Sequence, residues 1–139
     1  MILGIGHSAF GARDLEASLS FYIDQLGLEK AFELHRGDGS LWLVYLYCGD
    51  GSFIELFPED EVTERSDLAS YKHLCLRVDD MSLTLDDLAQ RGLNPLNPPS
   101  VGKDGNTQAW LEDPDGNLIE LMQIDADSDQ GRIVAQHTS

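Results

Sequence analysis

Residues 50–57, Asp-Gly-Ser-Phe-Ile-Glu-Leu-Phe, recur almost position for position at residues 115–122, as Asp-Gly-Asn-Leu-Ile-Glu-Leu-Met. Each stretch opens with turn-forming residues and continues with a short, mainly apolar run that is typical of a strand. The glutamates Glu55 and Glu120 hold the same place in the two copies. A repeat of this kind predicts that the chain contains two copies of one supersecondary unit.

The repeat extends beyond these strands, because both halves of the chain show the order strand, helix, strand, strand, strand. The patterns predict strands near 1–10, 28–36, 41–48, 52–58, 71–78, 106–112 and 117–124, an extended or turned segment at 94–100, and helices between Asp14 and Gly27 and near 82–91. We therefore expect an α+β fold in a single domain, 1–139, with module one at about 1–58 and module two at about 71–124. Between them lies a polar linker, 59–70. After them lies a polar tail, 125–139, which we expect to be mobile or to depend on a partner for its order.

The composition is that of an ordinary globular domain with a strongly acidic surface. The chain has 139 residues, 42% of them hydrophobic, and a formal net charge of −16. Such a charge repels nucleic acid and anionic membranes, so we expect neither as a partner. Cys48 and Cys75 lie inside apolar runs, and no basic and apolar leader is visible, so we expect two reduced thiols in a cytoplasmic protein. No stretch approaches the roughly 20 apolar residues that a membrane helix needs.

Four ionisable residues occupy repeat-related places in the predicted strands. His7 and His73 open the two halves, and the two glutamates lie mid-strand on faces that also carry apolar side chains. A buried carboxylate without a partner is costly, and imidazole and carboxylate together are ligands of divalent transition metals. Each residue alone has a simpler interpretation, as a hydrogen-bonded structural histidine or a solvent-facing glutamate at a sheet edge. Together they favour a metal site formed by His7, Glu55, His73 and Glu120.

Three further residues are candidates for contact with a substrate. Tyr45 and Trp110 stand at matching positions of the repeat, although packing in the core is the simplest role for both. Arg77 shares a strand face with His73. A surface ion pair and the binding of an anionic substrate group are both consistent with that position.

Two motifs make the chain resemble a known superfamily. They are Asp14-Leu-Glu-Ala-Ser-Leu-Ser-Phe-Tyr22, followed by Leu26-Gly27-Leu28, and Glu112-Asp-Pro-Asp-Gly-Asn-Leu-Ile-Glu-Leu121. On these residues the chain is similar to the vicinal oxygen chelate (VOC) superfamily over about residues 2–124. That superfamily includes glyoxalase I, bleomycin-resistance proteins, extradiol dioxygenases, fosfomycin-resistance enzymes and methylmalonyl-CoA epimerase. The resemblance implies two βαβββ modules whose strands curl into a half-barrel around a metal.

Within the superfamily, the ligand order His, Glu, His, Glu is similar to that of glyoxalase I, also called lactoylglutathione lyase. The resemblance implies a metal-dependent lyase or isomerase, with one nickel, cobalt, zinc, manganese or iron ion per chain and with sites shared across a homodimer. The metal would act as a Lewis acid that stabilises an enediolate of the substrate, with Glu120 as the principal base and Glu55 on the other face. The alternatives are an epimerase similar to methylmalonyl-CoA epimerase, an extradiol-type dioxygenase, and a metal-free small-molecule binding or resistance protein.

Two positions argue against glutathione as the natural thiol. In glutathione-using relatives that resemble this chain, an arginine stands at the position of Gly11 and an asparagine at that of Glu59. Because that arginine holds a carboxylate of the tripeptide, its absence and the charge of Glu59 predict weak binding of glutathione. Arg77, the repeat-equivalent of the missing arginine, is expected to bind a carboxylate or phosphate group of a different substrate.

Overall fold

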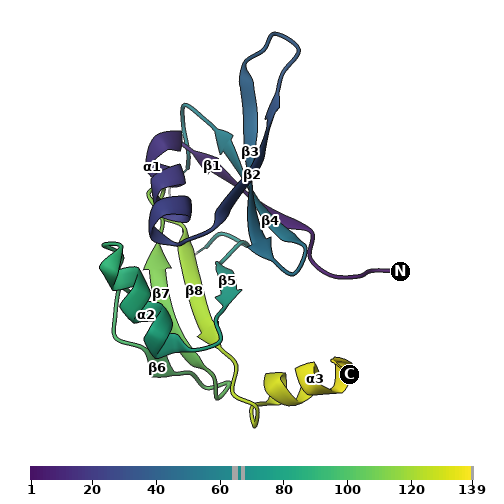
Figure 1. Ribbon diagram of the computed structural model, residues 1–139, viewed down its shortest axis with the longest axis vertical. Coiled ribbons are helices and arrows are strands. Elements are labelled where there is room, and N and C mark those ends of the chain that lie inside the picture. The colour runs from purple at the N-terminus through teal and green to yellow at the C-terminus, as the bar shows by residue number, and fades with distance from the viewer. Residues whose placement is uncertain (64–65, 67, 139) are drawn as a thin grey trace. The chain divides into compact units, whose positions relative to one another are not determined.

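The computed structural model describes residues 1–63, 66 and 68–138 (Figure 1). Three residues of the predicted linker, Glu64, Arg65 and Asp67, lie outside the described residues. By its internal contacts the chain divides into two compact units. The first unit is Met1–Ser66 with Pro114–Gly116, and the second is Asp67–Asp113 with Asn117–Ser139.

The first unit contains a four-stranded sheet with the order β1-β4-β3-β2. Its strands are β1 (His7–Ala12), β2 (Glu29–His35), β3 (Leu41–Gly49) and β4 (Ser52–Pro58). β1 runs parallel to β4, whereas β3 pairs antiparallel with both β2 and β4. The turn between β3 and β4 uses Gly49 and Gly51, whose φ angles of 95° and 73° suit glycine best. All four predicted strands are present, but the first begins at His7 and not at Met1.

One helical stretch connects β1 to β2. It begins as α1 (Leu15–Leu19), whose N-cap Asp14 accepts a hydrogen bond from a backbone N–H of the first turn (3.1 Å). It continues as the π-helical segment η1 (Ser20–Gln25), in which hydrogen bonds reach five residues back. The helix stops at Gly27, whose φ angle is 87°. The sequence predicted this helix and its ends but not its wider turns, because an amphipathic pattern does not distinguish them.

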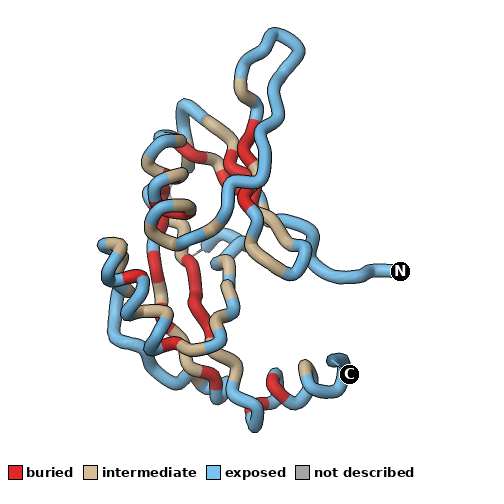
Figure 2. The backbone as a smooth tube through the Cα atoms, viewed as in Figure 1, coloured by how far each residue is buried: buried red, intermediate tan, exposed pale blue. Residues whose placement is uncertain are grey.

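The core of the first unit lies between this helical stretch and one face of the sheet (Figure 1). Phe21 and Tyr22 of η1 are buried, as are Ile54 and Leu56 of β4, and the buried positions cluster in the middle of β4 (Figure 2). Because successive side chains of a strand point to opposite faces, Glu55 points away from this core. The strand that fills the core therefore also presents a carboxylate on its other side.

The second unit repeats this arrangement. Its sheet has the order β5-β8-β7-β6, with β5 parallel to β8 and the other pairs antiparallel. Its elements are β5 (Leu74–Arg77), α2 (Met81–Gln90), β6 (Ser100–Val101), β7 (Thr107–Glu112) and β8 (Leu118–Gln123). Both units thus have the order strand, helix and three strands, and the predicted α+β fold is confirmed. β5 is shorter than the predicted strand 71–78.

Helix α2 covers β7 and β8 in the second unit. Its N-cap is Asp80, whose side chain accepts a hydrogen bond from a backbone N–H of the first turn (2.9 Å). Met81 and Leu88 are its buried residues. The sequence pattern predicts that Leu85, Leu88 and Ala89 point inward, but Ala89 is exposed, because only a narrow stripe of this helix meets the sheet.

The tail carries a third helix, α3 (Asp129–His137), which the sequence pattern did not predict. Ser128 caps it by accepting a hydrogen bond from the Gly131 N–H (2.9 Å). Asn106, which is fully buried, anchors the segment by accepting a hydrogen bond from the Asp125 N–H (2.9 Å). A Cβ atom at Gly131 would lie only 2.1 Å from the Asp125 carbonyl oxygen, so this position requires glycine. Within the described part of the chain, no helix is long and apolar enough to cross a membrane.

Candidate metal centre

The parallel pairing of β1 and β4 places the first histidine beside the first glutamate. His7 opens β1 and pairs with Phe53, so that Ala9 lies opposite Glu55. The Nε2 atom of His7 lies 2.7 Å from Oε2 of Glu55. Glu55 is only 7% exposed, whereas the side chain of His7 is about half exposed. The buried carboxylate therefore has an imidazole partner, which offsets part of the cost of its burial.

The second unit builds the same pair from equivalent strands. His73 directly precedes β5, and the parallel pairing of β5 with β8 places Cys75 opposite Glu120. The Nε2 atom of His73 lies 3.0 Å from Oε2 of Glu120, which is 5% exposed. In each unit the predicted histidine thus meets the predicted glutamate of its own half. Their role as metal ligands stays a prediction.

The donor atoms of each pair suit a divalent transition metal. The separations of 2.7 and 3.0 Å are those of a direct contact between imidazole nitrogen and carboxylate oxygen. The same two kinds of atom are ligands that divalent transition metals accept. Each pair supplies one nitrogen and one oxygen. Among residues 1–63, 66 and 68–138, no group of three or more His, Cys, Asp or Glu side chains is placed to hold an ion.

Tyr45 and Trp110, the aromatic residues at matching repeat positions, lie beside the two pairs. The antiparallel register places Tyr45 opposite Glu55 and Trp110 opposite Glu120. Each aromatic ring meets the imidazole ring of its own unit edge to face, at centroid distances of 6.2 Å for Tyr45 and 4.8 Å for Trp110. Both residues are only partly buried, so the simplest interpretation from sequence, packing in the core, is wrong for both.

Burial and hydrogen bonding change the pKa values of groups beside both glutamates. The pKa of Tyr45 is raised, chiefly because its side chain is hydrogen-bonded to Glu55 and then because of partial desolvation. Burial, followed by the negative charge of Glu120, raises the pKa of Cys75 to about 11. Both groups therefore keep their protons at neutral pH and can donate to the carboxylate opposite them.

Arg77 ends β5, where it pairs with Met122. It is exposed and lines an open groove of about 500 Å³ together with Val78, Asp79 and residues of α3. The sequence did not predict this groove, because it did not predict α3. A role for Arg77 in binding substrate stays a prediction.

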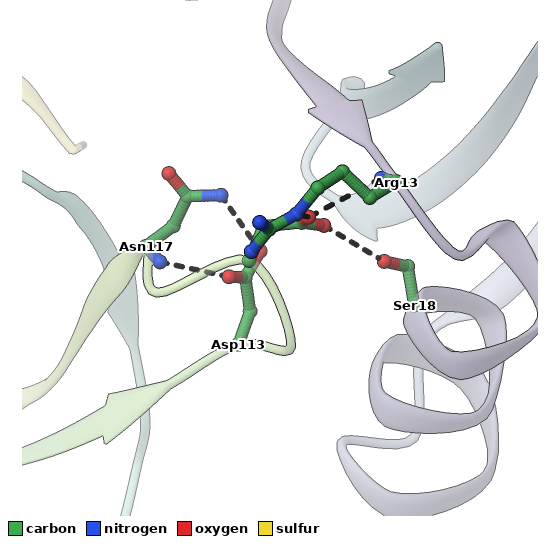
Figure 3. A network of polar contacts seen from close by, with 5 residues as sticks. Arg13, Ser18, Asp113 and Asn117 are labelled. Atoms are coloured by element: carbon green, nitrogen blue, oxygen red, sulfur yellow. Dashed lines mark hydrogen bonds and ion pairs between the residues drawn. The ribbon is translucent and has the colours of Figure 1, made fainter. Parts of the chain in front are cut away.

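Sequence reasoning did not predict the hydrogen bonds made by the turn between β7 and β8. Within this turn, Asn117 donates hydrogen bonds from its backbone and its side chain to Asp113, at 2.8 and 2.9 Å (Figure 3). Asp115 is buried and accepts hydrogen bonds from the backbone N–H and Nε of Arg13 and from the hydroxyl of Ser18, at 3.2 to 3.4 Å. These contacts make Asp115 part of the first unit. The sequence Asp-Pro-Asp-Gly identifies a turn, but nothing local identifies so distant a partner.

The fold agrees with the result of a comparison with known protein families. The chain belongs to the Glyoxalase/Bleomycin resistance protein/Dioxygenase superfamily, whose sequence pattern matches residues 4–121. The match spans both predicted modules. The resemblance to the VOC superfamily that the two motifs indicated is therefore confirmed.

Relatives with more specific names are similar over most of the chain. A protein from Synechocystis sp. named probable lactoylglutathione lyase is 32% identical over 128 residues, which are 88% of this chain and 97% of that protein. The lactoylglutathione lyase of Neisseria meningitidis serogroup A is 32% identical over 122 residues, 84% of this chain and 88% of the relative. Among solved structures, a glyoxalase family protein from Enterococcus faecalis has a TM-score of 0.73 at 26% identity and covers 86% of this chain and 97% of its own.

Proposed function

We propose that this chain is a metal-dependent lyase or isomerase of the glyoxalase I type, and that His7, Glu55, His73 and Glu120 together hold one divalent metal ion. The observation that carries the proposal is the repeated pair. In both units a mid-strand glutamate, at most 7% exposed, lies within 3.0 Å of an imidazole nitrogen. The similarity to relatives named lactoylglutathione lyase supports the same class of enzyme.

When bound, the metal would supply Lewis-acid stabilisation of negative charge on neighbouring substrate oxygens. Two nitrogen and two oxygen donors suit nickel, cobalt, zinc, manganese or iron. Both glutamates are buried, which favours neutralisation of their charge by a cation over solvation by water.

Glu120 is the residue that we propose as the principal base. Its carboxylate would take a proton from a substrate carbon next to a carbonyl group and return it to the neighbouring carbon. The electron pair of the broken C–H bond forms a carbon–carbon double bond while the π electrons of the carbonyl group move onto its oxygen. When the proton is added to the neighbouring carbon, the hydroxyl on the first carbon loses its proton and becomes the new carbonyl group, and the former carbonyl oxygen gains a proton, so substrate and product contain the same atoms. Return of the proton to the same carbon from the opposite side would give epimerisation. Glu55, the equivalent carboxylate of the first unit, is the second catalytic candidate.

We propose that the substrate is small and oxygenated, with an anionic group bound by Arg77 and with Tyr45 and Trp110 in contact with its remaining part. Glutathione fits less well as the thiol. A Cβ atom added at Gly11 would lie 3.4 Å from Cδ of Glu59, so the Glu59 carboxylate occupies the neighbourhood in which the resemblance would place an arginine. A carboxylate there repels the carboxylates of the tripeptide.

We also propose a homodimer with sites shared between the chains, as the resemblance to glyoxalase I implies. The apolar side chains at the N-terminus support an interface, because residues 1–3 and Ile5 are highly exposed in the single chain. The free thiols of Cys48 and Cys75 favour a reducing compartment, so we place the protein in the cytoplasm.

Metal content tests the ligand assignment. Protein stripped of metal and reloaded with nickel or zinc should hold about one ion per chain, and His73→Ala should lose most of it. His35→Ala is the matched control, because His35 also faces a glutamate, Glu33, at 3.5 Å, but on strand β2, where every residue is exposed. Equal metal in the two variants would overturn the assignment. A wild-type protein without affinity for metal would favour a metal-free binding protein.

A further inference from the structure

Helix α3 turns one side toward the open groove that Arg77 lines. The residues that line the groove from this segment fall at the spacing i, i+3, i+4 and i+7, which is one helical face, and are Gly131, Val134, Ala135 and the C-cap Thr138. Val134 is only partly buried and Ala135 is exposed. Because a surface helix normally covers its apolar side chains with a core, an open apolar face of this kind points to a ligand.

The first turn of α3 is held firmly in the second unit. Asn106, which is fully buried, accepts a hydrogen bond from the Asp125 N–H (2.9 Å) and donates one to Oε1 of Gln130 (3.0 Å). Gly131 packs so closely against the Asp125 carbonyl oxygen that no room is left for a Cβ atom. These contacts fix the helix where it begins, so this wall of the groove has a defined position.

The opposite wall of the groove combines apolar side chains with an arginine. Val78 follows β5 and Ile124 follows β8, and both are partly buried. The guanidinium of Arg77 suits a carboxylate, which it can bind through two parallel hydrogen bonds. Asp79 also lines the groove, but its carboxylate accepts a hydrogen bond from the Asp80 N–H (2.9 Å) at the start of α2. The groove therefore offers a cation and an apolar surface close together.

We propose that this groove binds a carboxylate that carries a short aliphatic chain, with the carboxylate on Arg77 and the chain against Val134 and Ile124. The groove volume of about 500 Å³ is in the range of small-molecule sites, roughly 300–1,000 Å³. The inference rests on the proposed function, in which Arg77 binds the anionic group of the substrate, and it adds an aliphatic chain next to that group. Arg77 pairs with Met122, which lies two residues, or about 7 Å, along β8 from Glu120. One substrate can therefore reach both residues.

A chemical-shift titration of the metal-free, ¹⁵N-labelled full chain with hexanoate tests the proposal. Hexanoate should shift the backbone amide signals of Val78, Val134 and Ala135. Butyrate, which is shorter by two CH₂ groups, should bind about five- to tenfold more weakly, because each buried CH₂ group adds to the affinity. Hexylammonium has the same chain with the opposite charge, so it should bind about tenfold more weakly or worse.

Two pairs of variants test the contacts. Arg77→Gln should raise the hexanoate Kd about tenfold or more, whereas Arg132→Gln, at an exposed arginine of α3 that pairs with Asp129, should leave it within about twofold. Val134→Asp should raise the Kd by a similar factor. Ile133→Asp is its control, because Ile133 is 55% exposed and points to another side of the same helix. Circular dichroism checks that both Asp variants keep α3, and if Val134→Asp loses helix, the two arginine variants decide.

The outcomes separate this inference from the proposed function. Hexanoate that shifts none of these amides, or that binds equally to wild type and Arg77→Gln, would overturn the inference and leave the metal site standing. A change of oligomeric state in Val134→Asp without a change in the hexanoate Kd would show that a second copy of the chain covers the groove, and would overturn it too. If the protein binds hexanoate but neither nickel nor zinc, the proposed function is wrong and the groove remains a carboxylate site.

Discussion

Removal of the Asp115 carboxylate, as Asp115→Ala, should destabilise the first unit. Asp115 accepts three hydrogen bonds of 3.2 to 3.4 Å from Arg13 and Ser18. The Arg13 side chain is about half exposed and regains water, but Ser18 is fully buried and its hydroxyl loses its acceptor. A buried donor without a partner costs about 1–3 kcal/mol, and a hydrogen bond to a charged group contributes about 1.5–3 kcal/mol at good geometry. Because these bonds are long, we expect a total loss of about 2–3 kcal/mol.

Thermal unfolding measures this loss. At about 3–4 °C per kcal/mol for a chain of this size, Asp115→Ala should melt roughly 6–12 °C below the wild type. Ser18→Ala removes the other end of the same hydrogen bond, so the double variant should lose less stability than the sum of the two single changes. Asp24→Ala, at an exposed position of η1, is the control and should change stability by less than about 0.5 kcal/mol. A melting temperature of Asp115→Ala within about 1 °C of wild type, or strictly additive effects, would refute this account of the turn.

The remaining predictions concern the candidate site and the chain as a whole. Glu120→Gln should keep the fold and lower kcat about 10²- to 10⁴-fold, with metal content measured alongside; full activity would refute its role as base. With methylglyoxal and glutathione, kcat/KM should stay below about 10⁶ M⁻¹s⁻¹, and an efficient reaction would show that glutathione is used after all. Light scattering at micromolar concentration should give a dimer, and a monomer alone would count against shared sites. Cys48, whose pKa is raised by burial, should react with iodoacetamide more slowly at pH 8 than a free thiol, since less of it is thiolate; peptide mass spectrometry decides this.

The elements of the fold could be predicted from sequence because their signals are local. The alternation in 52–57 and 117–122 requires only neighbouring residues, and it correctly placed Glu55 and Glu120 on the faces away from the two cores. The caps and glycines of the first helix likewise fixed its ends. The repeat then related each glutamate to a histidine of the same half, and the structure places the members of each pair in contact.

What the sequence did not predict depends on register or on distant contacts. The position of Tyr45 opposite Glu55 follows only once the turn at Gly49–Gly51 fixes which residues of β3 and β4 pair with each other. Helix α3 contains few apolar residues, and its start depends on the Ser128 cap and on Asn106, far back in the chain. The contact of Asp115 with Arg13 joins residues 102 positions apart, which no local pattern can report.

The three residues Pro114–Gly116 also limit how this protein can be divided. The chain segments on both sides of them belong to the second unit, so the chain passes from one unit to the other three times and not once. A fragment that ends at Ser66 would contain Arg13 and Ser18 but would lack their acceptor, Asp115. The two halves therefore resemble each other in sequence, but the first half depends on a residue that lies in the second half of the chain. A cut in the linker would leave two pieces that must reassemble through this turn, so fragment complementation and circular permutation should succeed only where the turn 114–116 stays free to dock.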